Sequence, residues 1–147
     1  MTYAITLSTL TNSIAALSIS GVTIKDIDQI SSSYQLATAI LAPRPERFVT
    51  DFSVAADELT KQKLTARYTL NYVYYHTQIG SVLDFAEYSD FMTNVLAIVS
   101  ALTENHILSG AIDTELPTVN DIGAVSDPAG NLFFGCTISI RVSQFVN

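Results

Sequence analysis

The chain has 147 residues, a formal net charge of -7, 48% hydrophobic residues and only 14% charged ones. This length suits a single domain over residues 1–147, with a core large enough to need no disulfide. The acidic balance disfavours proteins that grip nucleic-acid backbones, because that binding works through Lys and Arg. Ordinary soluble domains contain roughly 25% charged residues. We therefore expect part of the apolar surface to meet a partner.

The chain carries no signal for secretion or for a membrane. The opening residues MTYAITLSTLTNS lack the basic start and the unbroken apolar run of a signal peptide. No stretch approaches the roughly 18 uninterrupted apolar residues of a membrane helix. We therefore expect synthesis in a cytoplasm and no contact with a membrane.

The first part of the chain predicts a short helix followed by two strands. Apolar residues recur at helical spacing over 6–17, and Gly21 stops the helix. A brief strand is predicted over 22–25 and a second over 35–42, with an Asp-rich and Ser-rich loop between them.

Two prolines and two longer strands come next. Pro43 and Pro45 predict a stiff bend, because proline disrupts helices and lacks the N–H that ladder pairing needs. A strand is predicted over 47–54, a polar connection over 55–62, and a long strand over 63–76. The alternation in this long strand predicts one wet face and one core face. The predicted core face consists of Leu64, Ala66, Tyr68, Leu70, Tyr72 and Tyr74.

The last third of the chain predicts a second helix and a hairpin. The helix starts between Ser81 and Ser89 and ends near Asn105. Its predicted buried stripe is Tyr88, Phe91, Met92, Val95, Leu96, Val99 and Leu102, with Glu87, Asp90, Asn94, Ala97, Ala101 and Glu104 opposite. Strands over 118–125 and 132–146 are joined by the turn SDPAGN. This order predicts an α+β fold, a mostly antiparallel sheet with two main helices on one face.

The charges divide unevenly along the chain. Basic residues cluster at Arg44, Arg47, Lys61, Lys63 and Arg67, whereas no Lys or Arg occurs over 68–140. The acids of that second stretch are Asp84, Glu87, Asp90, Glu104, Asp113, Glu115, Asp121 and Asp127. One interpretation is an accident of a low-charge chain. The other is a basic flank and an acidic flank, through which copies could meet head to tail as rings require.

No residue pattern predicts a catalytic or metal site. His76 and His106 are far apart in the sequence and have no partner at helical spacing. Cys136 is the only cysteine and lies on the apolar face of a predicted strand, so it is expected in the core. Asp26 and Asp28 form a D-x-D, a weak signal for a divalent cation. We therefore expect no metal, no cofactor and no enzymatic activity.

Three stretches taken in order resemble a family of phage neck proteins. They are the opening helix running into SISGVTI (18–24), RFVTDFSV (47–54) followed by ARYTLNYVYYH (66–76), and GAVSDPAGNLFFGCTISIRVSQF (123–145). In this order the chain is similar to the tail-terminator proteins of long-tailed, siphovirus-like bacteriophages. None of these stretches is a chemical motif, so the resemblance rests on their order.

The resemblance implies an α+β subunit of a hexameric ring that caps the tail tube and offers a docking surface to the head connector, or stopper. The tail tube protein and the connector would then be its partners. DNA would pass through the lumen without specific binding. The protein would be made in the host cytoplasm and reside in the neck of the virion.

Two sets of residues are candidates for these roles. The candidate ring interface is Arg44, Arg47, Asp57, Glu58, Lys61, Lys63 and Arg67. The candidate acidic surface or lumen is Asp84, Glu87, Asp90, Asp113, Glu115 and Asp121. Alternatives within the same class are another neck component, such as a head-completion or connector protein, and the tube protein itself. An alternative from another class is a small metal-dependent enzyme or ligand-binding domain that uses Asp26 and Asp28.

Overall fold

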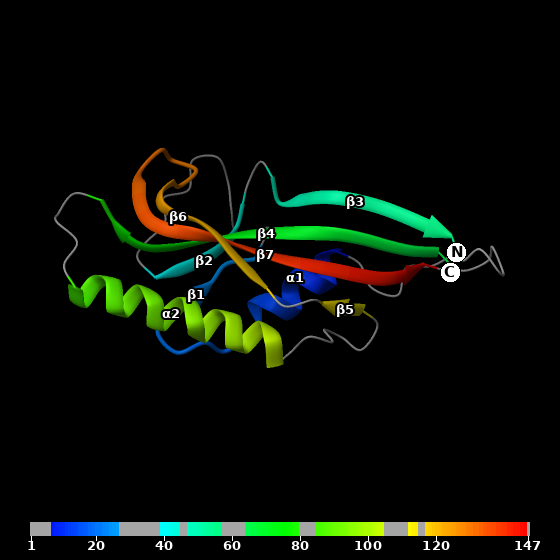
Figure 1. Cartoon of the computed structure of the whole chain (residues 1–147), viewed down its shortest axis with the longest axis horizontal. Coiled ribbons are helices and arrows are strands. Elements are labelled where there is room, and N and C mark those ends of the chain that lie inside the picture. The colour runs from blue at the N-terminus through cyan, green and yellow to red at the C-terminus, as the bar shows by residue number, and fades with distance from the viewer. Residues whose placement is uncertain are drawn as a thin grey trace.

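The protein has an α+β fold, as the sequence predicts (Figure 1). The computed structural model describes residues 7–26, 39–44, 47–56, 64–79, 85–104, 112–114 and 117–146. The elements of this part of the chain are α1 (Leu7–Ala15), β1 (Thr23–Ile24), β2 (Ile40–Pro43), β3 (Val49–Ala56), β4 (Leu64–Gln78), α2 (Phe85–Glu104), β5 (Ile112–Thr114), β6 (Thr118–Ser126) and β7 (Leu132–Val146). The strands form one sheet of order β1-β2-β4-β7-β5, in which β3 also pairs with β4 and β6 also pairs with β7.

The sheet is built on the antiparallel pair of β4 and β7, each 15 residues long. Their pairing runs from Leu64 opposite Val146 to Gln78 opposite Phe133, and His76 is the extra residue in its one bulge. At a rise of about 3.3 Å per residue, the pair is about 50 Å long. Strands β2 and β3 share the outer edge of β4, and β5 and β6 share the outer edge of β7. All these pairings are antiparallel, and β1 with β2 is the parallel exception.

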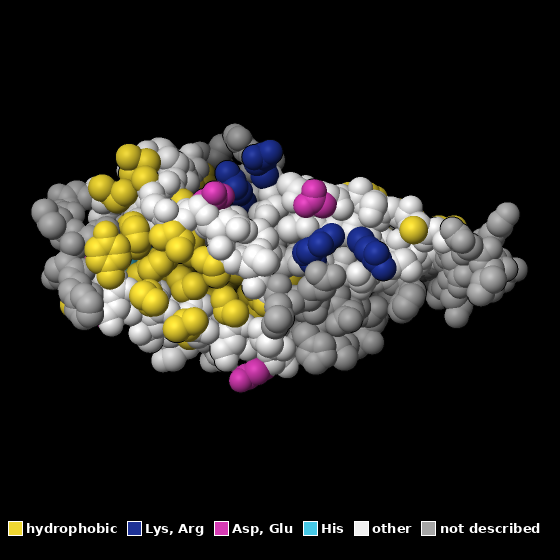
Figure 2. Space-filling view, in the orientation of Figure 1, with side chains coloured by type: hydrophobic (Ala, Val, Ile, Leu, Met, Phe, Trp, Pro, Cys, Tyr) yellow, Lys and Arg dark blue, Asp and Glu magenta, His cyan; other side chains and the backbone are white. Residues whose placement is uncertain are grey.

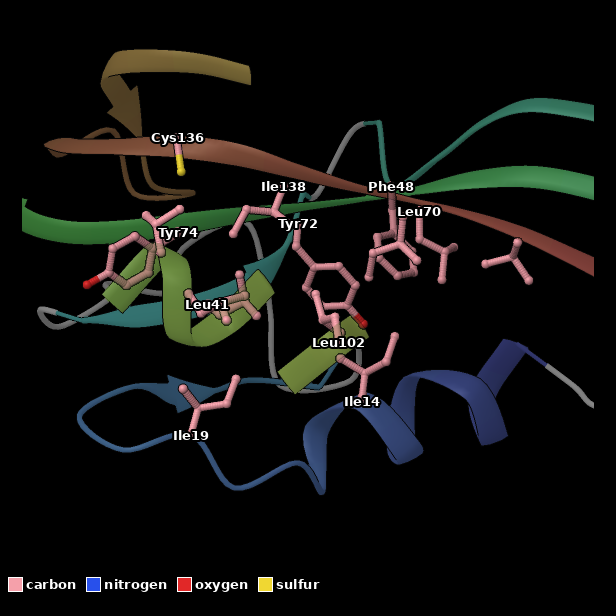
Figure 3. Close-up of a cluster of buried hydrophobic side chains, with 14 of the residues drawn as sticks. Ile14, Ile19, Leu41, Phe48, Leu70, Tyr72, Tyr74, Leu102, Cys136 and Ile138 are labelled. Atoms are coloured by element: carbon pink, nitrogen blue, oxygen red, sulfur yellow. The ribbon is translucent and has the colours of Figure 1, made fainter. Parts of the chain in front are cut away.

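Both helices pack on one face of this sheet, which confirms the predicted arrangement (Figure 1). Leu10 and Ile14 of α1 lie in one buried cluster with α2 and with the inward side chains of β4 and β7. In Figure 3, Tyr72 extends from β4 toward Leu102 and Ile14. An isolated helix of 9 residues would not persist in water, so α1 depends on this contact.

The buried stripe of α2 is rotated from the predicted one. Its core residues are Phe91, Val95, Ile98 and Leu102. Met92 and Leu96 are 60% and 64% exposed, and Tyr88 is also exposed, so their predicted burial is wrong. Ala97 and Ala101, predicted to face solvent, pack against the core instead. Apolar side chains surround most of this helix, so the pattern permits more than one stripe.

The prediction of one wet face on β4 is wrong for the C-terminal half of the strand. A second buried cluster on the other face contains Ile40, Ala42, Val73, Tyr75 and Phe133. The rings of Tyr75 and Phe133 meet edge to face, with their centroids 5.4 Å apart. In the N-terminal half, Arg67 is exposed as predicted and Asn71 is half-buried, but Thr69 between them is buried. The apolar cluster on the second face is confined to the other end of the strand.

The predicted strands are present with shifted ends. Strand β3 continues to Ala56, so Ala55 and Ala56 pair with β4 instead of starting the polar connection. The first part of the predicted strand 35–42 lies outside the described residues. The hairpin of β6 and β7 is confirmed. Strand β5 was not predicted, because three residues are too few to show an alternation.

Pro43 does take part in a ladder, contrary to prediction. It is the last residue of β2 and lies opposite Tyr72. The next residue, Arg44, donates its N–H to the Asn71 carbonyl at 2.9 Å, so Pro43 occupies a non-hydrogen-bonded position toward β4. On the other edge, β1 pairs with Ile40 and Leu41 and does not reach Pro43. The missing N–H therefore costs no ladder bond.

We expect Gly135→Ala to lower the free energy of unfolding by about 1–3 kcal/mol, because overpacking in a dense region costs that much. A Cβ on Gly135 would overlap the Tyr74 carbonyl oxygen and lie 3.1 Å from Val125 Cγ2. Urea denaturation measures the loss. Ala55→Ser, which adds one heavy atom at an exposed strand position, is the control and should change stability by less than about 0.5 kcal/mol. Equal losses in both variants would contradict crowding at Gly135.

The buried tyrosines predict a loss of stability at alkaline pH. Burial raises the hydroxyl pKa of Tyr68, Tyr72, Tyr74 and Tyr75, to about 12 for Tyr74 and Tyr75. In the unfolded chain these groups ionise near pH ~10. Between about pH 10 and 12 the unfolded state holds fewer protons, so stability is complete below this window and falls as pH rises through it. We expect the urea midpoint to fall there. Tyrosinate absorbance from all 7 tyrosines in a still-folded chain would refute this.

Candidate assembly surfaces

A polar network joins α2 to β4 through His76. The Asn94 amide donates to the Tyr74 hydroxyl at 2.7 Å, and that hydroxyl lies 2.8 Å from His76 Nδ1. Because Asn94 Nδ2 can only donate, the Tyr74 hydroxyl accepts from it, and a second hydrogen bond joins that hydroxyl to Nδ1. The Glu87 carboxylate lies 3.3 Å from Nε2 but outside good hydrogen-bond geometry.

This network has a structural explanation. Burial raises the pKa of Tyr74 to about 12, and the hydrogen bond from Asn94 only partly offsets this, so the hydroxyl stays neutral. His76 is buried and its ring meets Phe91 edge to face, with centroids 5.7 Å apart. The bulge at His76 turns its side chain into this network. The network therefore fixes the first turns of α2 on the sheet.

The residues considered for metal or nucleophilic chemistry are not brought together. Among the described residues, no group of three or more His, Cys, Asp or Glu side chains could hold a metal ion. Asp28 and His106 lie outside the described residues, and Asp26 is half-buried near β1. Cys136 is buried in the core cluster, as predicted, and burial raises its pKa to about 12. Such a thiol is a packing group rather than a nucleophile.

The described part of the predicted basic interface lies along β2, β3 and β4. Arg44 is half-buried at the end of β2, and Arg47 is exposed just before β3. Arg67 is exposed on β4 opposite Ser143. Arg141 of β7 lies diagonally across from Arg67 on the same face and was missing from the predicted set. The other predicted members, Asp57, Glu58, Lys61 and Lys63, lie outside the described residues.

The described members of the predicted acidic set lie on two different elements, α2 and β6. Glu87 faces His76, Asp90 is exposed on α2, and Asp121 is exposed on β6. Asp127 is buried in the β6–β7 turn, where its carboxylate accepts from the Asn131 N–H at 2.8 Å. That role is structural. Asp84, Glu115 and the side chain of Asp113 lie outside the described residues.

A surface that the sequence did not predict consists of exposed apolar side chains on α2 and β6. We define the α2–β6 patch as Tyr88, Met92, Leu96 and Ile122, all exposed. The first three follow each other at four-residue spacing on one side of the helix. The Tyr88 ring meets Phe134 of β7 at 5.4 Å, and Phe134 pairs with Ala124 of β6, two residues from Ile122. Figure 2 shows hydrophobic side chains gathered over α2 and β6.

A second exposed apolar surface lies on β3. We define the β3 strip as Val49, Phe52 and Val54, all exposed. The Phe52 ring stacks on Tyr68 of β4, with centroids 6.1 Å apart and planes 20° from parallel. Tyr68 belongs to the core cluster under the helices, so Phe52 lies on that same face of the sheet. Monomeric soluble domains seldom leave large contiguous apolar areas uncovered.

Each of the two apolar surfaces contains one residue that lies in a β-bulge, Phe52 in β3 and Ile122 in β6. On β3, Asp51 and Phe52 together lie opposite Tyr68, and on β6, Asp121 and Ile122 together lie opposite Cys136. Both aspartates have a left-handed backbone, with φ of 56° for Asp51 and 55° for Asp121. The Asp51 carboxylate also accepts from the Thr69 hydroxyl at 3.4 Å. Each bulge leaves its apolar residue exposed, Phe52 at 60% and Ile122 at 62%.

Comparison of the chain with protein-family models and with curated proteins finds no match. Neither of the two described helices is long and apolar enough to span a membrane.

We expect Tyr74→Phe to lower the free energy of unfolding by about 1–3 kcal/mol, because it leaves the Asn94 amide and the buried His76 Nδ1 without their partner. Tyr75→Phe is the matched control. Its hydroxyl makes one longer bond of 3.3 Å to the Ser126 carbonyl, so we expect a loss below about 1 kcal/mol. Urea denaturation measures both losses. A greater loss in the control would show that the network does not stabilise α2.

Proposed function

We propose that the protein is a structural subunit of the neck of a long-tailed bacteriophage. Copies form a ring that terminates the tail tube, offers a docking surface to the head connector, and lets DNA pass. The observation that carries this proposal is the presence of two different exposed apolar surfaces, the α2–β6 patch and the β3 strip, on opposite edges of one sheet. The resemblance of the sequence to tail-terminator proteins gives that association its biological setting.

Two different surfaces are what a ring subunit requires. In a closed ring each copy meets its two neighbours through different patches, whereas a twofold dimer uses the same patch on both copies. Strand β3 pairs with the outer edge of β4, and β6 with the outer edge of β7. The two surfaces therefore lie at opposite edges of the sheet. A copy that engages both has a neighbour on either side.

The charge distribution suits a passage for DNA. The formal net charge is -7, and no Lys or Arg occurs between Arg67 and Arg141. On α2, Asp90 lies about 160° around the helix from Met92, at 100° per residue. An exposed acid can therefore line a surface separate from the apolar patch. Such a surface repels phosphates and does not retain passing DNA.

The central strand pair supplies the rigidity that a ring subunit needs. Strands β4 and β7 pair over their full length, and α2 is fixed to them by the core cluster and by the network of Tyr74, His76 and Asn94. The edge surfaces thus keep a fixed spacing. A ring of fixed diameter can then match the end of a tube.

Light scattering on the purified protein tests the proposal. We expect a discrete species of about six subunits that persists on dilution, as a closed ring should. Negative-stain electron microscopy should show rings with a central opening, and these should bind isolated tail tubes at one end. A protein that stays monomeric at every concentration and does not bind tail tubes would refute the proposed function. Rings that bind only the head connector would favour the connector alternative.

A further inference from the structure

We propose that neighbouring copies of this chain meet through the β3 strip of one subunit and the α2–β6 patch of the next, with Phe52 and Ile122 as the central contacts. This inference rests on the proposed ring function and names its interface. The occupant of each apolar surface is thus a second copy of the same chain. The two bulges, the positions of the surfaces and the charges support it independently.

The first support is the backbone of the two edge strands. Each strand carries a bulge with an aspartate in the left-handed region, at Asp51 and Asp121. Bulges and edge charges discourage a strand from adding to the ladder. The same bulges leave Phe52 and Ile122 as the most exposed apolar residues of their strands. The edges are therefore suited to side-chain packing rather than to an intermolecular strand ladder.

The second support is the distance between the two surfaces. Phe52 lies opposite Tyr68, which pairs with Val142, whereas Ile122 lies opposite Cys136. Along β7, Cys136 and Val142 are about 20 Å apart at a rise of about 3.3 Å per residue. The surfaces also lie on opposite edges of the sheet. The β3 strip and the α2–β6 patch of one subunit therefore cannot contact each other. The strip of one subunit can contact only the patch of another.

The third support is charge complementarity. On the described residues of α2 and of the β6–β7 hairpin up to Ile140, the charged side chains are all acidic, and Asp121 lies directly beside Ile122 of the patch. In the half of the molecule that carries the β3 strip, Arg47, Arg67 and Arg141 outnumber the single described acid, Asp51. Arg67 and Arg141 lie on the other face of the sheet from Phe52, so they contribute to the field of this half rather than to the contact itself. Opposite fields steer two surfaces together and disfavour a patch-to-patch dimer. A head-to-tail contact is therefore the pairing that both charge and apolar area favour.

Complementation between two interface variants tests this inference in the full chain. The patch variant is Met92→Glu with Leu96→Glu, and the strip variant is Phe52→Glu with Val54→Glu. All four residues are exposed, so folding should be retained, as circular dichroism checks. Val54→Glu alone serves as the strip variant if loss of the Phe52–Tyr68 stacking impairs folding. Leu7→Glu, at an exposed apolar position of α1, is the matched control.

We expect each interface variant alone to fall from about six subunits to one in light scattering, while Leu7→Glu keeps the ring. An equimolar mixture of the two variants retains one intact contact for each pair of chains. It should therefore give dimers and nothing larger. A mixture that stays monomeric would overturn the head-to-tail pairing.

The outcomes separate the interface from the proposed function. If the wild-type protein forms rings and the interface variants form them equally well, the ring stands and the assigned interface is wrong. Homodimers of the strip variant alone would indicate a patch-to-patch contact and also overturn the inference. A wild-type chain that is monomeric at every concentration would defeat both the ring and its interface.

Discussion

The register between β4 and β7 is the constraint on which the rest of the structure depends. These two strands pair along their whole length, and every other strand except β1 attaches to one of their outer edges. A slip of β7 by one residue against β4 would turn Ile138 away from Tyr72 and the helices and expose the core side chains of β7 to water. The helices, the second buried cluster and both edge surfaces therefore take their positions from this single pairing. The bulge at His76 shifts the alternation of β4 by one residue, so that Thr77 lies opposite Phe134, and the imidazole of His76 lies beside Glu87 of α2.

Much of this fold could be predicted from the sequence, because the two long strands alternate clearly. The predicted strands over 63–76 and 132–146 agree closely with β4 and β7. The failures have identifiable physical reasons. Helix α2 carries apolar residues around most of its circumference, so its buried side is decided by the sheet and not by its own pattern. Val73 was predicted to be wet because alternation cannot show that the far face of a sheet is also buried.

The surfaces were harder to predict than the fold. Reading charge along the chain grouped Glu87 with Asp127, yet one faces a histidine and the other closes a turn. Arg141 was overlooked because its neighbour Arg67 is adjacent only through the strand pairing. Met92 and Leu96 were assigned to the core because they are apolar, so the sequence did not predict the α2–β6 patch to which they belong. One signal was available: Asp51 and Asp121 each lie inside a predicted strand, where aspartate is depleted, and an aspartate there is a sign of a bulge.

Two uncovered edges present a small sheet protein with a problem, since unpaired strand edges recruit other strands without limit. Barrels solve it by closure, and many domains solve it with charge. Here β3 and β6 each carry a charged residue in a bulge, and each places a large apolar side chain directly after it. The charge and the bulge disfavour the addition of further strands to the edge. The exposed apolar side chain still offers a surface for packing. In the proposed ring, a contact made by side chains would have a defined geometry, and because the two edges differ, it would relate neighbouring copies by a fixed rotation. When repeated rotations bring the last copy back to the first, the assembly is a closed ring, and when they do not, it is an open fibre.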